Sequence, residues 1–145
     1  KVGAGRIIAA GRDRIALNAL AADVHLGLDE LGKVADEKID VVLDYLWGPP
    51  AEATLRALKS RARYVQIGAM AGDPINLPSA VLRSTGISIT GSGLGSVPMQ
   101  AIIREVPRFL AIAAELEVNP IEVPLRDVAQ VWNERTGARR IVLVP

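Results

Sequence analysis

Two arginines follow the first apolar run of the sequence. The run 7–10 (IIAA) ends at Gly11, and Arg12 and Arg14 come next. In nucleotide-binding α/β sheets, a carboxylate after such a strand binds the 2′-hydroxyl of an adenosine ribose. Here that carboxylate is absent, and guanidinium groups could hold a 2′-phosphate bidentately. The pattern predicts a preference for NADP(H), with Gly11, Arg12 and Arg14 at the phosphate. The alternative is an arginine exposed to solvent on a surface turn.

Two glycine-containing segments follow expected strands further along the chain. Gly68 and Ala69 come after the run 63–67, and GSGLGS at 91–96 comes after 87–90. Open parallel sheets bind ligands at the carboxyl ends of their strands, and glycine lets backbone atoms approach a flat ring closely. The two segments therefore predict a ligand site, although each is also compatible with an ordinary loop. GSGLGS is not a phosphate loop, because it comes late and lacks the G-x-G-x-x-G spacing.

Few side chains offer acid–base or nucleophilic chemistry. His25 is the only histidine and has no placed partner, which favours a surface or half-buried position over proton transfer. Asp44 could meet a ribose hydroxyl or bond to nearby backbone, and we favour the structural role. Ser92 and Ser96 lack a His–Asp arrangement, and without cysteine or a second histidine there is no zinc ligand set. We predict no catalytic residue and no metal ligand in this chain.

Strand-like and helix-like segments alternate, which predicts βαβ units and a parallel sheet. The expected strands are 6–10, 24–28, 39–46, 63–67, 87–90 and 139–144, with an extended segment at 119–124. The expected helices are 13–22, capped by Asp13, then 51–59, a long helix from Pro98, and 127–132. Residues 29–38 could form a loop or a surface helix, and GPP at 48–50 predicts a turn. Pro107 predicts a kink or two short helices.

Two apolar features stand out in the last third of the chain. Trp132 is expected to anchor the last helix to the sheet. The helix from Pro98 carries a stripe at helical spacing. Its members are Met99, Ile102, Ile103, Val106, Leu110 and Ala113.

Composition favours the α/β class. Half of the 145 residues are apolar and only 3% are aromatic, so the core must consist of Ile, Val, Leu and Ala. The net charge of +1 argues against nucleic acid or an anionic membrane as a partner. No apolar run is long enough to cross a bilayer, and no signal peptide is recognisable. The absence of cysteine is compatible with the cytoplasm, the location that we expect.

In order and spacing these segments resemble the carboxyl-terminal part of the medium-chain dehydrogenase/reductase superfamily. This superfamily includes zinc alcohol dehydrogenases and zinc-free NADPH:quinone oxidoreductases. The resemblance covers essentially the whole chain. It implies an α/β fold with a Rossmann-type parallel sheet that has helices on both faces. This sheet lacks the first strand and its glycine-rich loop. The matching segments are GAGRIIAAGRD, AADVHLGLDE, IDVVLDYLWGPPAEATLRALKSRARYVQIGAMAG, GISITGSGLGS and VPLRDVAQVWNERTGARRIVLVP.

The resemblance also implies roles for individual positions. Gly11 stands where NAD-dependent members carry their acidic residue, so that Gly11-Arg12 is NADP-type. The strand near 87–90 is the usual dimer edge of the family, which implies a homodimer. The other implied cofactor positions are Asp44, Tyr45 and Leu46 beside the adenine and ribose, Ile67, Gly68 and Ala69 at the nicotinamide, Ser92, Gly93 and Leu94 at its carboxamide, and Arg139 near the phosphates.

The departures from the family concern what precedes the chain. The missing first strand normally lies between the strands 6–10 and 39–46, and without it the sheet has exposed edges on both sides of a gap. We expect either a fragment or a second polypeptide that fills the gap. The start at Lys1 and the helix-end pattern at 2–5 lead us to expect that the parent protein begins upstream. We divide the chain into a partial NADP-binding domain, 1–118, and a closing segment, 119–145.

These observations predict the cofactor-binding part of an NADP(H)-dependent oxidoreductase. The parent enzyme would transfer a hydride to or from a carbonyl, enone or quinone, and we expect this chain alone to be inactive. One alternative is a non-catalytic dimerisation or nucleotide-binding module with a vestigial site. Another is an adenosyl-dependent methyltransferase, against which Gly11-Arg12 counts because such enzymes typically place an acid there.

Overall fold

The computed structural model describes residues 3–116, 118–134, 136–137 and 139–145, and only the backbone of residues 36 and 94. The predicted helix end at 2–5 lies partly outside these ranges, and residues 3–5 are not helical. The contacts within the chain divide it into two compact units, Lys1–Pro98 and Met99–Pro145. The functional division predicted after residue 118 stays a prediction.

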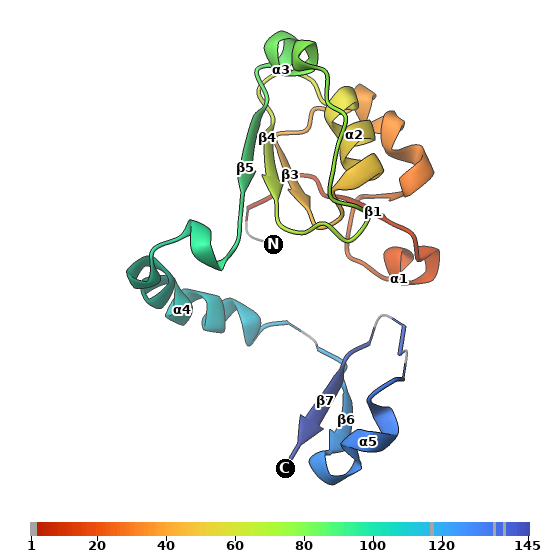
Figure 1. The fold of residues 1–145 in the computed structure, drawn as a ribbon, viewed down its shortest axis with the longest axis vertical. Helices are drawn as coiled ribbons and strands as arrows, with labels where there is room; N and C mark the ends of the chain where they lie inside the picture. The colour runs from red at the N-terminus through yellow and green to blue at the C-terminus, as the bar shows by residue number, and fades with distance from the viewer. Residues whose placement is uncertain (1–2, 117, 135, 138) are drawn as a thin grey trace. The chain divides into compact units, whose positions relative to one another are not determined.

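The first unit is an α/β arrangement of short strands and helices (Figure 1). Its elements follow each other in the order β1 (Ile8–Gly11), α1 (Arg14–Asn18), β2 (Val24–Gly27), the 3₁₀ segment η1 (Leu28–Asp36), β3 (Val41–Asp44), α2 (Gly48–Ala57), β4 (Arg63–Gln66), α3 (Ser79–Thr85), β5 (Ser88–Gly91) and η2 (Leu94–Ser96).

All strand pairs in this unit are parallel, as the alternation of segments predicts. β1 pairs with β2, and β3, β4 and β5 form a second sheet in that order. Among the described residues β1 and β3 do not pair, which confirms the expected gap in the sheet. β5 is an edge strand of the second sheet, as the dimer prediction requires.

The core of the first unit lies where α2 packs against the second sheet. Leu55 of α2 and Tyr64 of β4 are almost completely buried, and Ile87 joins them just before β5. The Trp47 ring meets Tyr64 edge to face, with ring centroids 6.3 Å apart. α2 also packs against η1, which links the two sheets through their helical segments.

Several element boundaries differ from the sequence prediction for local reasons. Asp13 caps α1 as expected, accepting from the backbone N–H of Ile15 and Ala16 at 3.0 Å each. The helix ends at Asn18, however, four residues before the predicted end, and the backbone N–H of Leu20 bonds to the Leu17 carbonyl at 3.1 Å in the turn that follows. GPP at 48–50 begins α2 rather than forming a turn, since proline suits the first helical positions, where no N–H partner is needed.

The second unit contains one long helix and a small parallel sheet. Its elements are α4 (Met99–Ala113), β6 (Ile121–Pro124), η3 (Leu125–Asp127), α5 (Val128–Val131) and β7 (Ile141–Val144). β6 and β7 pair in parallel, as Figure 1 shows. α4 continues through Pro107 as one helix, so the two-helix alternative is wrong.

Several large apolar side chains of this unit are exposed. No residue of α4 is buried, and the stripe members Met99, Ile103 and Leu110 are each more than half exposed. Trp132 is 77% exposed, so its prediction as a buried anchor is wrong. α5 ends at Val131, and the indole lines an open hollow beside Ile141 of β7.

Candidate functional site

A groove lies between β1 and β3 in the first unit. Its volume is about 1100 Å³, and its walls come from β1, η1 and β3 with the segments that flank them. The predicted site residues Gly11 and Arg12 line it, and so do Asp44, Tyr45 and Leu46. The structure therefore brings the predicted phosphate and ribose segments to the same groove.

The backbone edges that face this groove have no strand partner among the described residues. Ile7 accepts hydrogen bonds from the β2 side, and Asp40 and Asp44 accept from the β4 side. Because backbone groups alternate along a strand, the N–H and C=O groups of Ile8 and Leu43 face the other way, toward the groove. Both sheets thus end at open edges beside the predicted ribose site.

Asp44 shapes the chain where β3 ends. The residue is 8% exposed, and its carboxylate accepts from the backbone N–H of Leu46 at 2.8 Å and of Trp47 at 3.0 Å. These bonds hold Trp47 at φ 54°, a conformation rare for a side chain of this size. Burial, and then the neighbouring Asp44 carboxylate, raise the pKa of Tyr64. Asp44 therefore has the structural role that we favoured from the sequence.

The segment predicted to contact the nicotinamide lies directly beside the end of β3. The Ile67 and Gly68 N–H groups both donate to the Asp44 carbonyl, at 2.7 and 3.2 Å. A Cβ atom on Gly68 would lie 2.8 Å from the Tyr45 carbonyl oxygen, so only glycine fits without a shift of backbone. Ala69 follows in the same loop. Close approach of two strand-end loops therefore requires glycine at this position, while the predicted approach of a ligand ring stays a prediction.

The segment after β5 continues the same row of strand ends. Ser92 donates its N–H to the Gln66 carbonyl at 2.8 Å, which places it beside β4. The Gly93 N–H donates to the Ser96 hydroxyl at 3.1 Å, and that hydroxyl donates back to the Gly93 carbonyl at 2.7 Å. Leu94 begins the short segment η2. Ser96 thus closes a turn, and the sequence offered no nucleophilic role for it.

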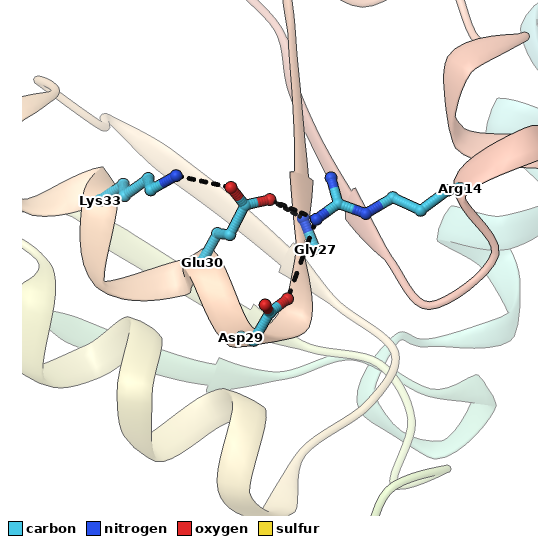
Figure 2. A network of polar contacts seen from close by, with 5 residues as sticks. All are labelled: Arg14, Gly27, Asp29, Glu30 and Lys33. Atoms are coloured by element: carbon cyan, nitrogen blue, oxygen red, sulfur yellow. Dashed lines mark hydrogen bonds and ion pairs between the residues drawn. The ribbon is translucent and has the colours of Figure 1, made fainter.

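The two arginines after β1 have different surroundings. Arg12 is exposed and lines the groove. Arg14 turns away to an ion pair with Glu30 of η1, at 2.5 Å between Nη2 and Oε2 (Figure 2). Hydrogen bonds from Lys33, from the Gly27 backbone and from Arg14 lower the pKa of Glu30 to about 2. Glu30 was not predicted from the sequence, although the Glu30/Lys33 spacing on a helical segment was a signal for such a pair.

Arg139 belongs to the second unit. Its Nε donates to the Asn119 carbonyl at 3.1 Å, and its Nη2 donates to the Pro120 carbonyl at 2.7 Å. These bonds tie the segment before β7 to the segment before β6. Its approach to cofactor phosphates stays a prediction.

No acid–base or metal centre is found in the part of the chain that the structure describes. His25 Nε2 donates to the Leu20 carbonyl at 3.1 Å, a structural bond. No group of three or more His, Cys, Asp or Glu side chains that could hold a metal ion occurs within those ranges. Within the same ranges no helix has the length and apolarity needed to span a membrane.

Comparisons with known proteins give one curated relative and many solved structures. A protein of Emericella nidulans named probable NADPH-dependent quinone reductase tdiC is 31% identical over 122 residues, which are 74% of this chain and 34% of the relative. No protein-family model matches the sequence. The chain thus spans about a third of the curated relative that it matches.

Two solved structures share the fold. A thermostable alcohol dehydrogenase from Pyrobaculum aerophilum superposes with a TM-score of 0.69 at 24% identity, over 97% of this chain and 43% of that one. A quinone oxidoreductase from Thermus thermophilus, also solved with NADPH, superposes with a TM-score of 0.69 at 24% identity, over 88% of this chain and 44% of that one. Fold and sequence together show that this chain belongs to the medium-chain dehydrogenase/reductase superfamily and corresponds to a carboxyl-terminal part of its Rossmann-type members.

Proposed function

We propose that this chain is the NADP(H)-binding part of an oxidoreductase that transfers a hydride to or from a carbonyl, enone or quinone. The observation that carries the proposal is Arg12, an exposed guanidinium directly after Gly11 at the end of β1, on the groove that Asp44–Leu46 also line. The relative from Emericella nidulans, whose name includes NADPH dependence, supports the same cofactor.

The residues at this groove fit the adenosine half of the cofactor. Arg12 supplies a charged fork for a 2′-phosphate, and Gly11 adds no carboxylate that would repel it. Across the groove, Tyr45 is 57% exposed and offers an aromatic face to an adenine ring. NADP(H), when bound, supplies the hydride, while the protein binds and orients it.

The strand-end loops would position the nicotinamide half. Gly68 and Ala69 lie beside β3, and Ser92 lies beside β4, so backbone groups rather than catalytic side chains line this edge. We retain the expectations of an enzyme that needs further chain for activity, of a homodimer through β5, and of a cytoplasmic location.

Titration calorimetry of the chain with NADPH and with NADH tests the proposal. Loss of a charge-assisted bidentate contact costs about 1.5–3 kcal/mol, or roughly 10- to 150-fold in affinity. We expect Arg12→Ala to weaken the binding of NADPH by that factor and to leave the affinity for NADH unchanged. Arg83→Ala, which removes an exposed arginine of α3, is the matched control. Equal affinities for NADPH and NADH in the unaltered chain, or a dimer that binds neither, would contradict the proposal and favour a vestigial module.

A further inference from the structure

The Arg14 side chain is held by a carboxylate that is itself fixed in place. Glu30 Oε2 accepts from Arg14 Nη2 at 2.5 Å and from the Gly27 backbone N–H at 2.8 Å. Its Oε1 accepts from Lys33 Nζ at 2.5 Å. Figure 2 shows the carboxylate between the two cations, with Asp29 nearby. The bond to Gly27 joins Glu30 to the backbone that begins η1, so this anion does not depend on Arg14 for its position.

The charges of this network cancel. Two cations, Arg14 and Lys33, face two anions, Glu30 and Asp29, whose Oδ1 lies 3.9 Å from Arg14 Nη2. A phosphate that approached Arg14 would have to displace a carboxylate and would meet its negative charge. Arg12 is exposed at the groove, and no hydrogen bond or ion pair of its side chain is found among the described residues.

We propose that Glu30 withholds Arg14 from the bound nucleotide, so that Arg12 alone reads the 2′-phosphate. This inference rests on the proposed function, which it deepens by separating two arginines that the sequence treats alike. It makes Glu30 a residue that limits the preference for NADP(H). The alternative is that the Arg14–Glu30 ion pair only stabilises the contact between α1 and η1. Substitutions of Glu30 would then change the free energy of unfolding and leave the discrimination of the 2′-phosphate unchanged.

The test compares adenosine 2′,5′-bisphosphate with adenosine 5′-monophosphate as probes of the whole chain. Their affinity ratio, measured by calorimetry, isolates the 2′-phosphate. Glu30→Gln keeps an acceptor oxygen for Gly27 and removes the charge that holds Arg14. We expect this variant to raise the ratio about twofold to fivefold, the effect of one exposed ion pair. The added substitution Arg14→Gln should cancel the gain, whereas Arg14→Gln alone should leave the ratio unchanged.

Two controls separate release of Arg14 from a general change in charge. Glu52→Gln is the matched change outside the groove, since Glu52 of α2 also pairs with an arginine, Arg56, and also accepts from a backbone N–H, that of Asn76. It should not change the ratio. Lys33→Gln keeps the Arg14–Glu30 pair and should not raise the ratio. A gain in the Glu52 variant that equals the gain in the Glu30 variant would overturn the proposal.

A second readout follows the Nε–H signals of the arginines by NMR during titration with adenosine 2′,5′-bisphosphate. Arg12 should shift in the unaltered chain and Arg14 should not, whereas both should shift in the Glu30→Gln chain. The inference is overturned if Arg14 already responds in the unaltered chain, or if Arg14 stays silent in the Glu30→Gln chain although Arg12 responds in the unaltered chain. Silence of Arg12 in both chains would refute the proposed function instead.

Discussion

Replacing Asp44 by alanine should destabilise the first unit strongly, because two backbone donors lose their acceptor together. The carboxylate is buried and receives the N–H groups of Leu46 and Trp47. Leaving a buried donor without a partner costs about 1–3 kcal/mol. Both groups are only partly buried, so water replaces some of the loss, and we expect Asp44→Ala to lower the free energy of unfolding by about 2–4 kcal/mol.

Asparagine at position 44 should cost less than alanine. Its amide oxygen still accepts one of the two N–H groups, but the bond no longer involves a charge. We therefore expect Asp44→Asn to lower the free energy of unfolding by about 1–2 kcal/mol, half of the loss in Asp44→Ala. This second variant keeps the test usable if Asp44→Ala fails to fold.

Urea unfolding followed by tryptophan fluorescence measures these losses. Trp47 lies against Tyr64 in the core and reports on the first unit, so the assay uses a Trp132→Phe background. Asp40→Ala is the matched control, since Asp40 precedes β3 with an exposed side chain and should cost less than about 0.5 kcal/mol. The reasoning is refuted if Asp44→Ala costs under about 1 kcal/mol or no more than the Asp40 control.

Four further outcomes are expected. Leu55→Ala, at a completely buried position, should cost about 2–5 kcal/mol in the same urea assay. Gly68→Ala should weaken NADPH binding in calorimetry, because its Cβ would press on the Tyr45 carbonyl; unchanged affinity would contradict this. Asp13→Ala should cost about 0.5–2 kcal/mol through loss of the α1 cap, measured as a lower urea midpoint. The pKa of Glu30 is lowered from 4.5 to about 2, so its contribution to stability is complete above pH 4.5 and is lost as the pH falls toward 2; acid unfolding of Glu30→Gln should lack this component.

The strands were largely predictable because their signal is local. The runs at 24–28 (VHLGL) and 63–67 (RYVQI) are short and contain residues that favour strands, such as Val, Ile and Tyr, and they match β2 (Val24–Gly27) and β4 (Arg63–Gln66) closely. The cap at Asp13 was predictable for the same reason. The helix predicted to 22 was too long, because the run ALAA at 19–22 favours a helix locally although α1 ends at Asn18.

The candidate site was predictable in its segments and unpredictable in its side chains. The structural role of Asp44 followed from strand-end chemistry, and the structure supplies its bonds to backbone N–H groups. Gly68 was predicted for the approach of a ligand ring, whereas the contact that requires glycine is the one with the Tyr45 carbonyl. The prediction that Trp132 anchors the last helix failed, and its indole is exposed. Apolar character alone does not specify which surface a side chain contacts.

The sequence by itself determined the parallel α/β class, the order of its strands and the position of Arg12 after β1, because strand propensity, turn residues and covalent order are local properties. Only the tertiary structure decided what Arg14 does. Its partner Glu30 lies in another element, on the far side of β2 along the chain, and an ion pair between such residues forms only when the folded backbone brings them within a few ångströms. Two neighbouring arginines of equal charge therefore have different surroundings, which only the folded chain specifies.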